Sequence, residues 1–233
     1  MHRSTPTILA LGGGRPDNRI LARFIVSLAD VSAPRVCYIG TAGGDPPDAY
    51  RTFAENYSGL GCQPVELSLF RQPEEPLEAL VMRQNIIYVG GGNTRNMLAL
   101  WRLWGLDVIL RRAWESGVVL CGSSAGSICW FQQGTTDSWP GRISPLDCLG
   151  FLPGSNCPHY HSEPLRRPTY LKMVAEGQLP PGLATDDTVG LLFRGDELER
   201  VVSASPDAGA WRVEACAGGV TETPLACRML AES

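Results

Sequence analysis

A short glycine-rich segment carries the residue of this chain with the clearest chemical potential. Residues 122–126 read Gly-Ser-Ser-Ala-Gly, the Gly-x-Ser-x-Gly pattern that holds a serine nucleophile on a tight turn between a strand and a helix. The apolar run at 118–121 predicts that strand, and the small residues after it predict the start of the helix. Ser124 would then stand at the carboxyl edge of a sheet, with the N–H of Ala125 available to an oxyanion. The pattern also fits a turn without chemistry, so the partners of Ser124 decide its role.

A serine nucleophile needs a base, and histidine is the usual base near neutral pH. The chain has three histidines. His2 lies at the N-terminus, which we expect to be frayed, whereas His159 and His161 share a polar loop at 156–163, after the serine segment. The residues therefore favour a base from this loop and leave the choice between its two histidines open.

The third member of such a site is a carboxylate that orients the imidazole and stabilises its cation. Asp137 follows the serine segment in a polar stretch, and Asp186 and Asp187 stand together just before the apolar run at 189–193. Each could instead be an ordinary loop residue. The sequence alone does not separate these positions.

A second glycine run offers a further oxyanion donor. Residues 90–94 read Gly-Gly-Gly-Asn-Thr between a buried strand and a helix, so their amides would face the same sheet edge as Ser124. A phosphate-binding loop is the rival interpretation. Neither this run nor the one at 12–14 has the Gly-x-Gly-x-x-Gly pattern or the lysine of a P-loop, so nucleotide binding is disfavoured.

Alternating strands and helices position these segments. Apolar runs predict strands at 7–11, 35–40, 64–70, 85–89 and 118–121. Helical periodicity predicts helices at 18–29, 50–60, 77–82, 97–103 and 108–115. This order predicts an α/β fold with a mostly parallel sheet and helices on both faces.

The pattern loosens after residue 150. We expect strands at 183–193 and 197–203, then a closing antiparallel ribbon from 209–213 and 218–221. The stretches 137–153 and 161–168 are expected to be loops that could close a small pocket. No linker or repeat divides the chain, so a single domain over 1–233 is the expectation.

The composition narrows the class of protein. A formal net charge of −4 argues against a nucleic-acid partner, and no apolar stretch approaches the length of a membrane span. The chain has eight cysteines and no Cys-x-x-Cys pair. Several of them fall in expected strands, so we expect buried reduced thiols and a cytoplasmic protein.

Taken together, four segments resemble the peptidase E family of serine peptidases, which includes the cyanophycinases. They are the glycine loop at 88–94, the serine turn at 122–126, the histidine segment at 156–160 and the acidic segment at 183–187. The resemblance implies a three-layer α/β/α fold similar to the class I glutamine amidotransferase domain, with a serine nucleophile on a strand-turn-helix elbow.

The resemblance also implies a role for each matching residue. Ser124 matches the nucleophile and His159, directly after a proline, matches the base, which leaves His161 as a pocket residue. Gly92 and Ala125 match the oxyanion amides. For the acid the family offers two positions, those of Asp187 and Asp137, and we favour Asp187 because a strand edge can hold it rigidly. The chain departs from the family pattern at Thr188, where glycine is common.

Family members release an N-terminal aspartate from short peptides, mostly dipeptides, without a metal or other cofactor. The resemblance thus implies a small peptide as the partner, and a monomer or homodimer. The residues expected to contact the substrate are Gly91, Asn93, His161, Glu163, Arg166 and Arg167.

Two alternatives stay open. A cyanophycinase-like enzyme would cleave an aspartate–arginine polymer and would need an open groove. A non-catalytic protein on the same scaffold would bind a small amino-acid-like ligand without acylation of the serine.

Overall fold

The computed structural model describes residues 5–14 and 18–231, so His2 lies outside the described residues. In this part of the chain eight strands form the larger sheet, in the order β14-β11-β10-β1-β5-β4-β2-β3. Five of its seven strand pairs are parallel. Its strands are β1 (Thr7–Leu11), β2 (Arg35–Ile39), β3 (Gln63–Leu67), β4 (Ile86–Val89), β5 (Val119–Ser123), β10 (Val189–Arg194), β11 (Glu197–Ser203) and β14 (Cys227–Met229).

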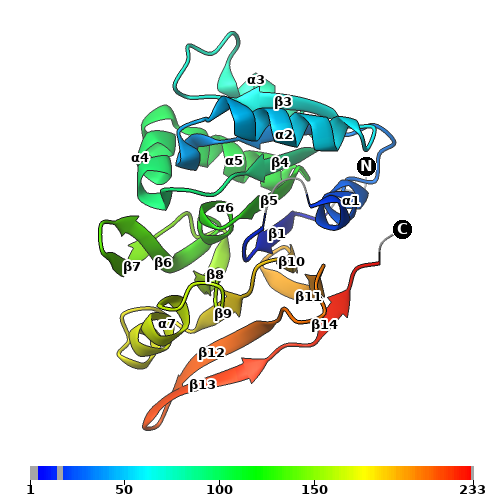
Figure 1. The fold of residues 1–233 in the computed structure, drawn as a ribbon. Coiled ribbons are helices and arrows are strands. Elements are labelled where there is room, and N and C mark those ends of the chain that lie inside the picture. The colour runs from blue at the N-terminus through cyan, green and yellow to red at the C-terminus, as the bar shows by residue number, and fades with distance from the viewer. Residues whose placement is uncertain (1–4, 15–17, 232–233) are drawn as a thin grey trace.

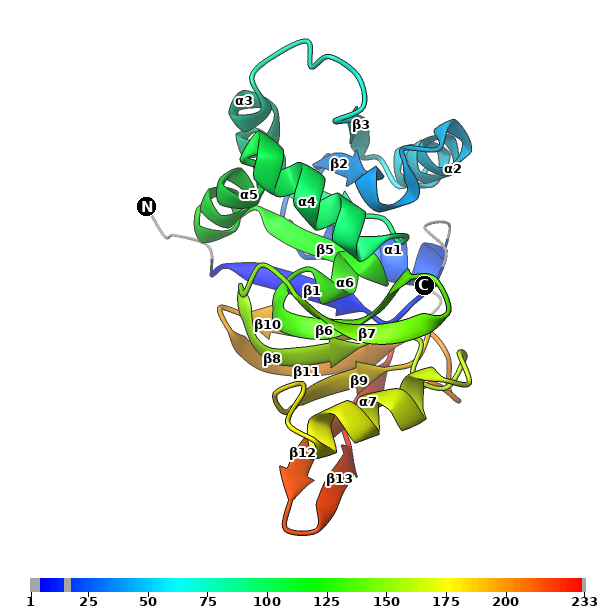
Figure 2. The same cartoon turned by 90° about the vertical axis from the view of Figure 1, so that its left-hand side faces the viewer.

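Helices cover both faces of this sheet, as the alternating pattern predicts. Successive residues of β1 show why: Ile8 and Ala10 join the core under one set of helices, whereas Leu9 and Leu11 join the core under the other. Figure 2 shows α4 and α5 in front of β4 and β5, with α1 behind. The helices and the short 3₁₀ turn are α1 (Arg19–Ser27), η1 (Thr41–Gly43), α2 (Pro47–Ser58), α3 (Leu77–Met82), α4 (Thr94–Trp104) and α5 (Leu106–Glu115). The three-layer, mostly parallel α/β fold is therefore confirmed.

A second sheet of six strands, in the order β13-β12-β9-β8-β6-β7, lies beside the first (Figure 1). Helix α7 (Arg166–Ala175) packs on it through a separate apolar cluster. The strands are β6 (Phe131–Trp139), β7 (Arg142–Asp147), β8 (Leu152–Cys157), β9 (Gly182–Thr185), β12 (Ala210–Cys216) and β13 (Gly219–Pro224). The ribbon β12–β13 is the antiparallel pair expected from the sequence, but the rest of this sheet was not predicted.

The helix expected after Ser124 is present but is a single turn, α6 (Ala125–Ile128), because the chain then passes through the buried Trp130 into β6. One expectation about local structure is wrong. The apolar stretch 183–193 is two strands in different sheets rather than one, since β9 pairs with β8 and β12 whereas β10 pairs with β1 and β11. The turn between β9 and β10 contains Asp186 and Asp187.

Of the two stretches expected to be loops, one is largely regular structure. Residues 137–153 hold the end of β6, all of β7 and the start of β8, whereas residues 161–165 form turns before α7 begins at Arg166. All eight cysteines are free. Within the described ranges, no helix has the length and apolar character needed to cross a membrane.

Candidate active site

Ser124 stands on a strained turn between β5 and α6. Its backbone has φ 59 and ψ −112, a region that residues other than glycine rarely adopt. The Ser124 N–H donates to the Leu11 carbonyl at 3.2 Å, and the Ser124 carbonyl accepts from two α6 amides. A Cβ on Gly122 would lie 2.5 Å from the Gly126 carbonyl oxygen, so the sharp turn requires glycine there.

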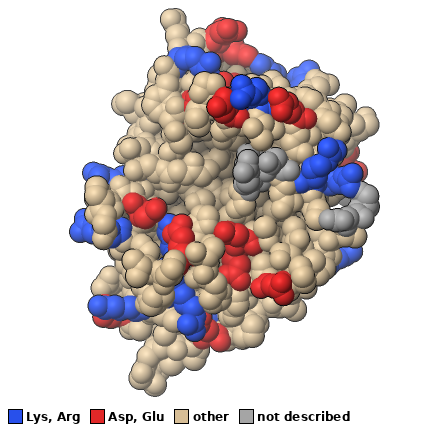
Figure 3. Space-filling view, viewed as in Figure 1, with Lys and Arg blue, Asp and Glu red and all other residues tan. Residues whose placement is uncertain are grey.

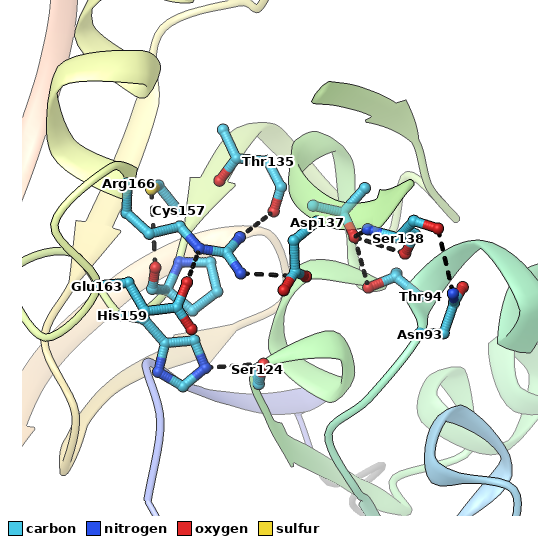
Figure 4. Close-up of polar contacts among 12 residues, drawn as sticks. Asn93, Thr94, Ser124, Thr135, Asp137, Ser138, Cys157, His159, Glu163 and Arg166 are labelled. Atoms are coloured by element: carbon cyan, nitrogen blue, oxygen red, sulfur yellow. Dashed lines mark hydrogen bonds and ion pairs between the residues drawn. The ribbon is translucent and has the colours of Figure 1, made fainter. Parts of the chain in front are cut away.

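A continuous chain of hydrogen bonds links Ser124 to His159 and Asp187. Ser124 Oγ lies 2.9 Å from His159 Nε2, and His159 Nδ1 lies 2.6 Å from Asp187 Oδ1. Figure 4 shows the imidazole of His159 pointing at Ser124. The three residues come from the ends of β5, β8 and β9, so their meeting depends on both sheets.

The carboxylate of Asp187 is suited to orienting this imidazole. The pKa of Asp187 is lowered, first by its hydrogen bond with His159, against the opposing effect of burial. Its side chain is 40% exposed, compared with 19% for His159. Asp187 is therefore ionised near neutral pH.

Backbone strain concentrates at this place. Among the described residues, five that are not glycine have a positive φ, and three of them are Ser124, His159 and Thr188, at 59°, 56° and 67°. The backbone of Thr188 is left-handed, a conformation that glycine adopts more readily than threonine. Such strain persists where the surrounding structure enforces it, which is typical of functional sites.

The glycine turn after β1 holds the site together, and sequence reasoning missed this role. A Cβ on Gly13 would lie 1.9 Å from Asp187 Oδ1 and 2.7 Å from His159 Cε1. The carbonyl of Gly12 accepts the His159 N–H at 3.1 Å, and the carbonyl of Gly13 accepts the Thr188 N–H at 3.1 Å. The signal in the sequence is a glycine run at the end of an expected strand, which does not by itself indicate this role.

Asp137, the other candidate acid, is held elsewhere. Its carboxylate pairs with Arg166 at 3.2 Å and is 63% exposed. Figure 4 shows Asp137 across the site from His159, without an interaction drawn between them. The structure therefore brings Asp187 and not Asp137 to His159.

The second glycine run lies directly against Ser124. A Cβ on Gly91 would be 3.2 Å from Ser124 Cβ, and one on Gly92 would be 2.2 Å from the Ala42 carbonyl oxygen. Within the described part of the chain, the N–H groups of Gly92 and Ala125 form no hydrogen bond. Unpaired amides beside a nucleophile are what an oxyanion requires.

The side chain of Asn93 forms hydrogen bonds that stabilise the fold. Its Oδ1 accepts the Asn96 N–H at 2.9 Å and so caps α4, and its Nδ2 donates to the Ser138 carbonyl at 3.2 Å. Asn93 therefore ties the glycine loop to the end of β6.

Arg166 is the cation enclosed in the site. Its side chain is 2% exposed, and its guanidinium donates to Glu163 at 2.5 Å and to the Thr135 carbonyl at 3.1 Å, besides pairing with Asp137. Glu163 is 44% exposed. Arg166 thus holds two accessible carboxylates in place above Ser124 (Figure 4).

The last two residues expected to contact the substrate, Arg167 and His161, interact with the second sheet. Arg167 donates to both oxygens of Glu222 on β13. His161 Nδ1 lies 2.8 Å from Asp186 Oδ1, and its ring packs edge-on against Trp211, with centroids 4.6 Å apart. Neither side chain joins the hydrogen-bond chain of Ser124.

The site opens on a hollow in the face shown in Figure 3, over α6, with acidic side chains along its lower edge. No group of three or more His, Cys, Asp or Glu side chains in the described ranges has the arrangement of a metal site.

The model of peptidase family S51 matches residues 8–201. The chain belongs to peptidase family S51. A protein named uncharacterized peptidase YgaJ, from Bacillus subtilis (strain 168), is 45% identical to this chain over 227 residues. The match covers 96% of this chain and 98% of that protein. A protein named peptidase E from Shewanella denitrificans is 29% identical over 163 residues, covering 66% of this chain and 68% of that protein.

Solved structures show the same S51 fold. A peptidase from an acI-B1 Actinobacterium superposes with a TM-score of 0.72 at 18% identity, covering 97% of this chain and 96% of that one. A putative peptidase E protein from Listeria monocytogenes EGD-e superposes with a TM-score of 0.59 at 17% identity, covering 96% and 100%. The resemblance to peptidase E is confirmed, and the chain is a peptidase of this family.

Proposed function

We propose that this S51 peptidase is a serine exopeptidase that hydrolyses short peptides, with N-terminal Asp-X dipeptides as its substrates. The observation that carries the proposal is the hydrogen-bond chain from Ser124 Oγ through His159 to Asp187, at 2.9 and 2.6 Å. A nucleophile, a base within reach and a carboxylate that orients the base form the minimal machinery of acyl transfer.

In this mechanism His159 carries its proton on Nδ1, which donates a hydrogen bond to Asp187, so Nε2 is free to accept the Ser124 proton. Ser124 Oγ then attacks the scissile carbonyl. The imidazolium gives its proton to the leaving amine, and a water activated by His159 hydrolyses the acyl-enzyme. Ionised Asp187 stabilises the imidazolium in both steps.

The oxyanion is bound by the N–H groups of Gly92 and Ala125. These N–H groups have no hydrogen-bond partner among the described residues, and Gly91 lies so close to Ser124 that an added Cβ would be 3.2 Å from Ser124 Cβ; both observations support this assignment. Donors already fixed in place stabilise developing charge without reorganisation at the moment of reaction.

The free amine of the substrate binds to the carboxylates of Asp137 and Glu163. Both are accessible, and Arg166 pairs with each of them. Recognition of a free amine restricts cleavage to the first residue of a peptide, which supports an exopeptidase. The preference for aspartate is the one implied by the resemblance to peptidase E.

A dipeptide panel tests this function. We expect hydrolysis of Asp-Leu in the presence of EDTA, with much slower hydrolysis of Leu-Leu, Glu-Leu and N-acetyl-Asp-Leu. Ser124→Ala should abolish turnover and labelling by a fluorophosphonate while leaving the circular dichroism spectrum unchanged. Substantial turnover by Ser124→Ala would refute the mechanism, and equal cleavage of Leu-Leu would refute only the aspartate preference. Cleavage of an aspartate–arginine polymer in place of dipeptides would make the enzyme cyanophycinase-like.

A further inference from the structure

Two arginines at the edge of the site share one tryptophan. The guanidinium carbon of Arg95 lies 5.0 Å from the centre of the Trp139 ring, and that of Arg142 lies 5.6 Å from it. Arg95 is in the first turn of α4, whereas Trp139 and Arg142 flank the turn between β6 and β7. Both arginine side chains are exposed. An aromatic face holds each cation in a defined position at little cost in hydration.

These guanidinium groups have no anionic partner. Across residues 5–14 and 18–231, neither Arg95 nor Arg142 forms a side-chain hydrogen bond or an ion pair. Arg166 and Arg167 differ, because each is already paired with a glutamate. Two like charges fixed on one ring repel each other, and an anion bound by both would remove that repulsion.

The arginines border the candidate active site through a set of short contacts. The Ser138 carbonyl accepts from Asn93 Nδ2, and Ser138 Oγ accepts the Arg95 N–H, both at 3.2 Å. Asn93 comes two residues after Gly91, the glycine that lies against Ser124, and Figure 4 shows Asn93, Ser138 and Asp137 on the same side of the site. The turn that carries Trp139 is thus anchored to the glycine loop.

Charge divides across this edge. Figure 3 shows basic side chains at the left edge of the face, where the β6–β7 hairpin lies in Figure 1, and acidic side chains between them and the hollow. Asp137 and Glu163, the proposed amine-binding groups, supply negative charge on the inner side. A short peptide that carries both an ammonium and a carboxylate complements this division.

We propose that Arg95 and Arg142, fixed on Trp139, bind a carboxylate of the substrate peptide. The inference rests on the proposed peptidase function and adds a binding site to it. The carboxylate comes either from an acidic side chain or from the C-terminus of a short peptide, and both present two oxygens to a guanidinium fork.

Kinetics of the double variant R95Q/R142Q test the proposal. We expect the KM for Asp-Leu to rise roughly tenfold or more, because two charge-assisted contacts are lost, while kcat changes little. R95K/R142K keeps the charge and should recover part of the affinity. Arg23→Gln on α1 is the matched control, since Arg23 is exposed and has no ion pair among the described residues. Its KM should equal that of the wild type.

Two substrate pairs identify the source of the carboxylate. If the arginines bind the C-terminus, the wild type will discriminate against Asp-Leu amide relative to Asp-Leu, and R95Q/R142Q will lose that discrimination. If they bind the acidic side chain, the wild type will discriminate against Asn-Leu relative to Asp-Leu, and R95Q/R142Q will lose that discrimination.

The inference and the proposed function fail in different ways. An unchanged KM for Asp-Leu in a folded R95Q/R142Q, with an active wild type, overturns the carboxylate site alone. Both proposals are overturned by two results together. The wild type hydrolyses no peptide of the panel, and calorimetry detects no binding of Asp-Leu to the Ser124→Ala variant.

Discussion

Two histidine–aspartate pairs stand next to each other, and only one of them reaches a nucleophile. His159 pairs with Asp187 at 2.6 Å and His161 pairs with Asp186 at 2.8 Å, so both pairs join the same two chain segments. His159 is 19% exposed and lies 2.9 Å from Ser124 Oγ, whereas His161 is 47% exposed.

The aspartates also differ in what else they hold. Asp186 is 13% exposed, and besides the His161 imidazole it accepts the N–H groups of His161 and Gly209, which ties the loop after β8 to the start of β12. Asp187 is 40% exposed and serves the imidazole of His159. The comparison teaches that the pairing of aspartate with histidine does not by itself identify a candidate catalytic base. What distinguishes His159 is its hydrogen bond with Ser124.

The largest difference should appear between the two histidines. His159→Gln removes the base and should lower kcat by about 10⁴-fold or more, by analogy with other serine hydrolases. His161→Gln, the matched control two residues away, should change kcat by no more than about threefold, because His161 does not contact Ser124. Steady-state hydrolysis of Asp-Leu measures both. Equal losses in the two variants would contradict the assignment of the base.

Substitution of Asp187 should mainly lower kcat, whereas substitution of Asp186 should mainly lower stability. Asp187→Asn should lower kcat by roughly 10³- to 10⁴-fold, since the imidazole loses its orienting acceptor. Asp186→Asn should leave kcat within about tenfold but lower the free energy of unfolding by about 1 kcal/mol, because the N–H groups of His161 and Gly209 lose a charged acceptor. Urea denaturation and kinetics on the same samples distinguish the outcomes. A large kcat loss in Asp186→Asn alone would reverse the roles.

A smaller loss of kcat should follow from a methyl group added at Gly13, next to the His159–Asp187 pair. Gly13→Ala would place a Cβ 1.9 Å from Asp187 Oδ1, so the His159–Asp187 pair must shift. A displacement on the order of 1 Å costs about 10²-fold in kcat. Gly59→Ala, at a φ of −65 and with the nearest atom 3.3 Å from the added Cβ, is the control and should keep wild-type activity. Full activity in Gly13→Ala would show that the turn after β1 tolerates a methyl group.

The smallest effect concerns the pH dependence of stability. The pKa of Asp187 is lowered in the folded state, first by the hydrogen bond with His159, so its ionised form stabilises the fold above the ordinary aspartate pKa of about 3.9. That contribution is lost as the pH falls through the lowered pKa. Because Asp187 is 40% exposed, we expect less than about 1 kcal/mol. Denaturation at pH 6 and pH 3 should show the difference between wild type and Asp187→Asn shrinking at the lower pH, whereas a constant difference would contradict this origin.

The sequence by itself determined the local features of this protein. Alternating apolar and amphipathic segments predicted the parallel strands and covering helices of the larger sheet, because side-chain periodicity is a local property. The serine turn was predictable for the same reason: Gly122 and Gly126 permit a sharp turn that few other sequences allow. The choice of His159 depends on the resemblance to known sequences, and the preference for Asp187 depends on its place at the edge of an expected strand. The geometry agrees with both.

Tertiary structure alone decided the rest. The apolar stretch 183–193 gives no sign that it crosses from one sheet to the other, because strand partners are chosen by residues far away in the chain. That crossing is what carries Asp187 to His159. Gly13 likewise reads as one glycine among 26 until β10 and the loop after β8 pack against it and leave no space for a Cβ. Contacts between segments distant in sequence depend on the packing of the whole chain, and no local pattern records them.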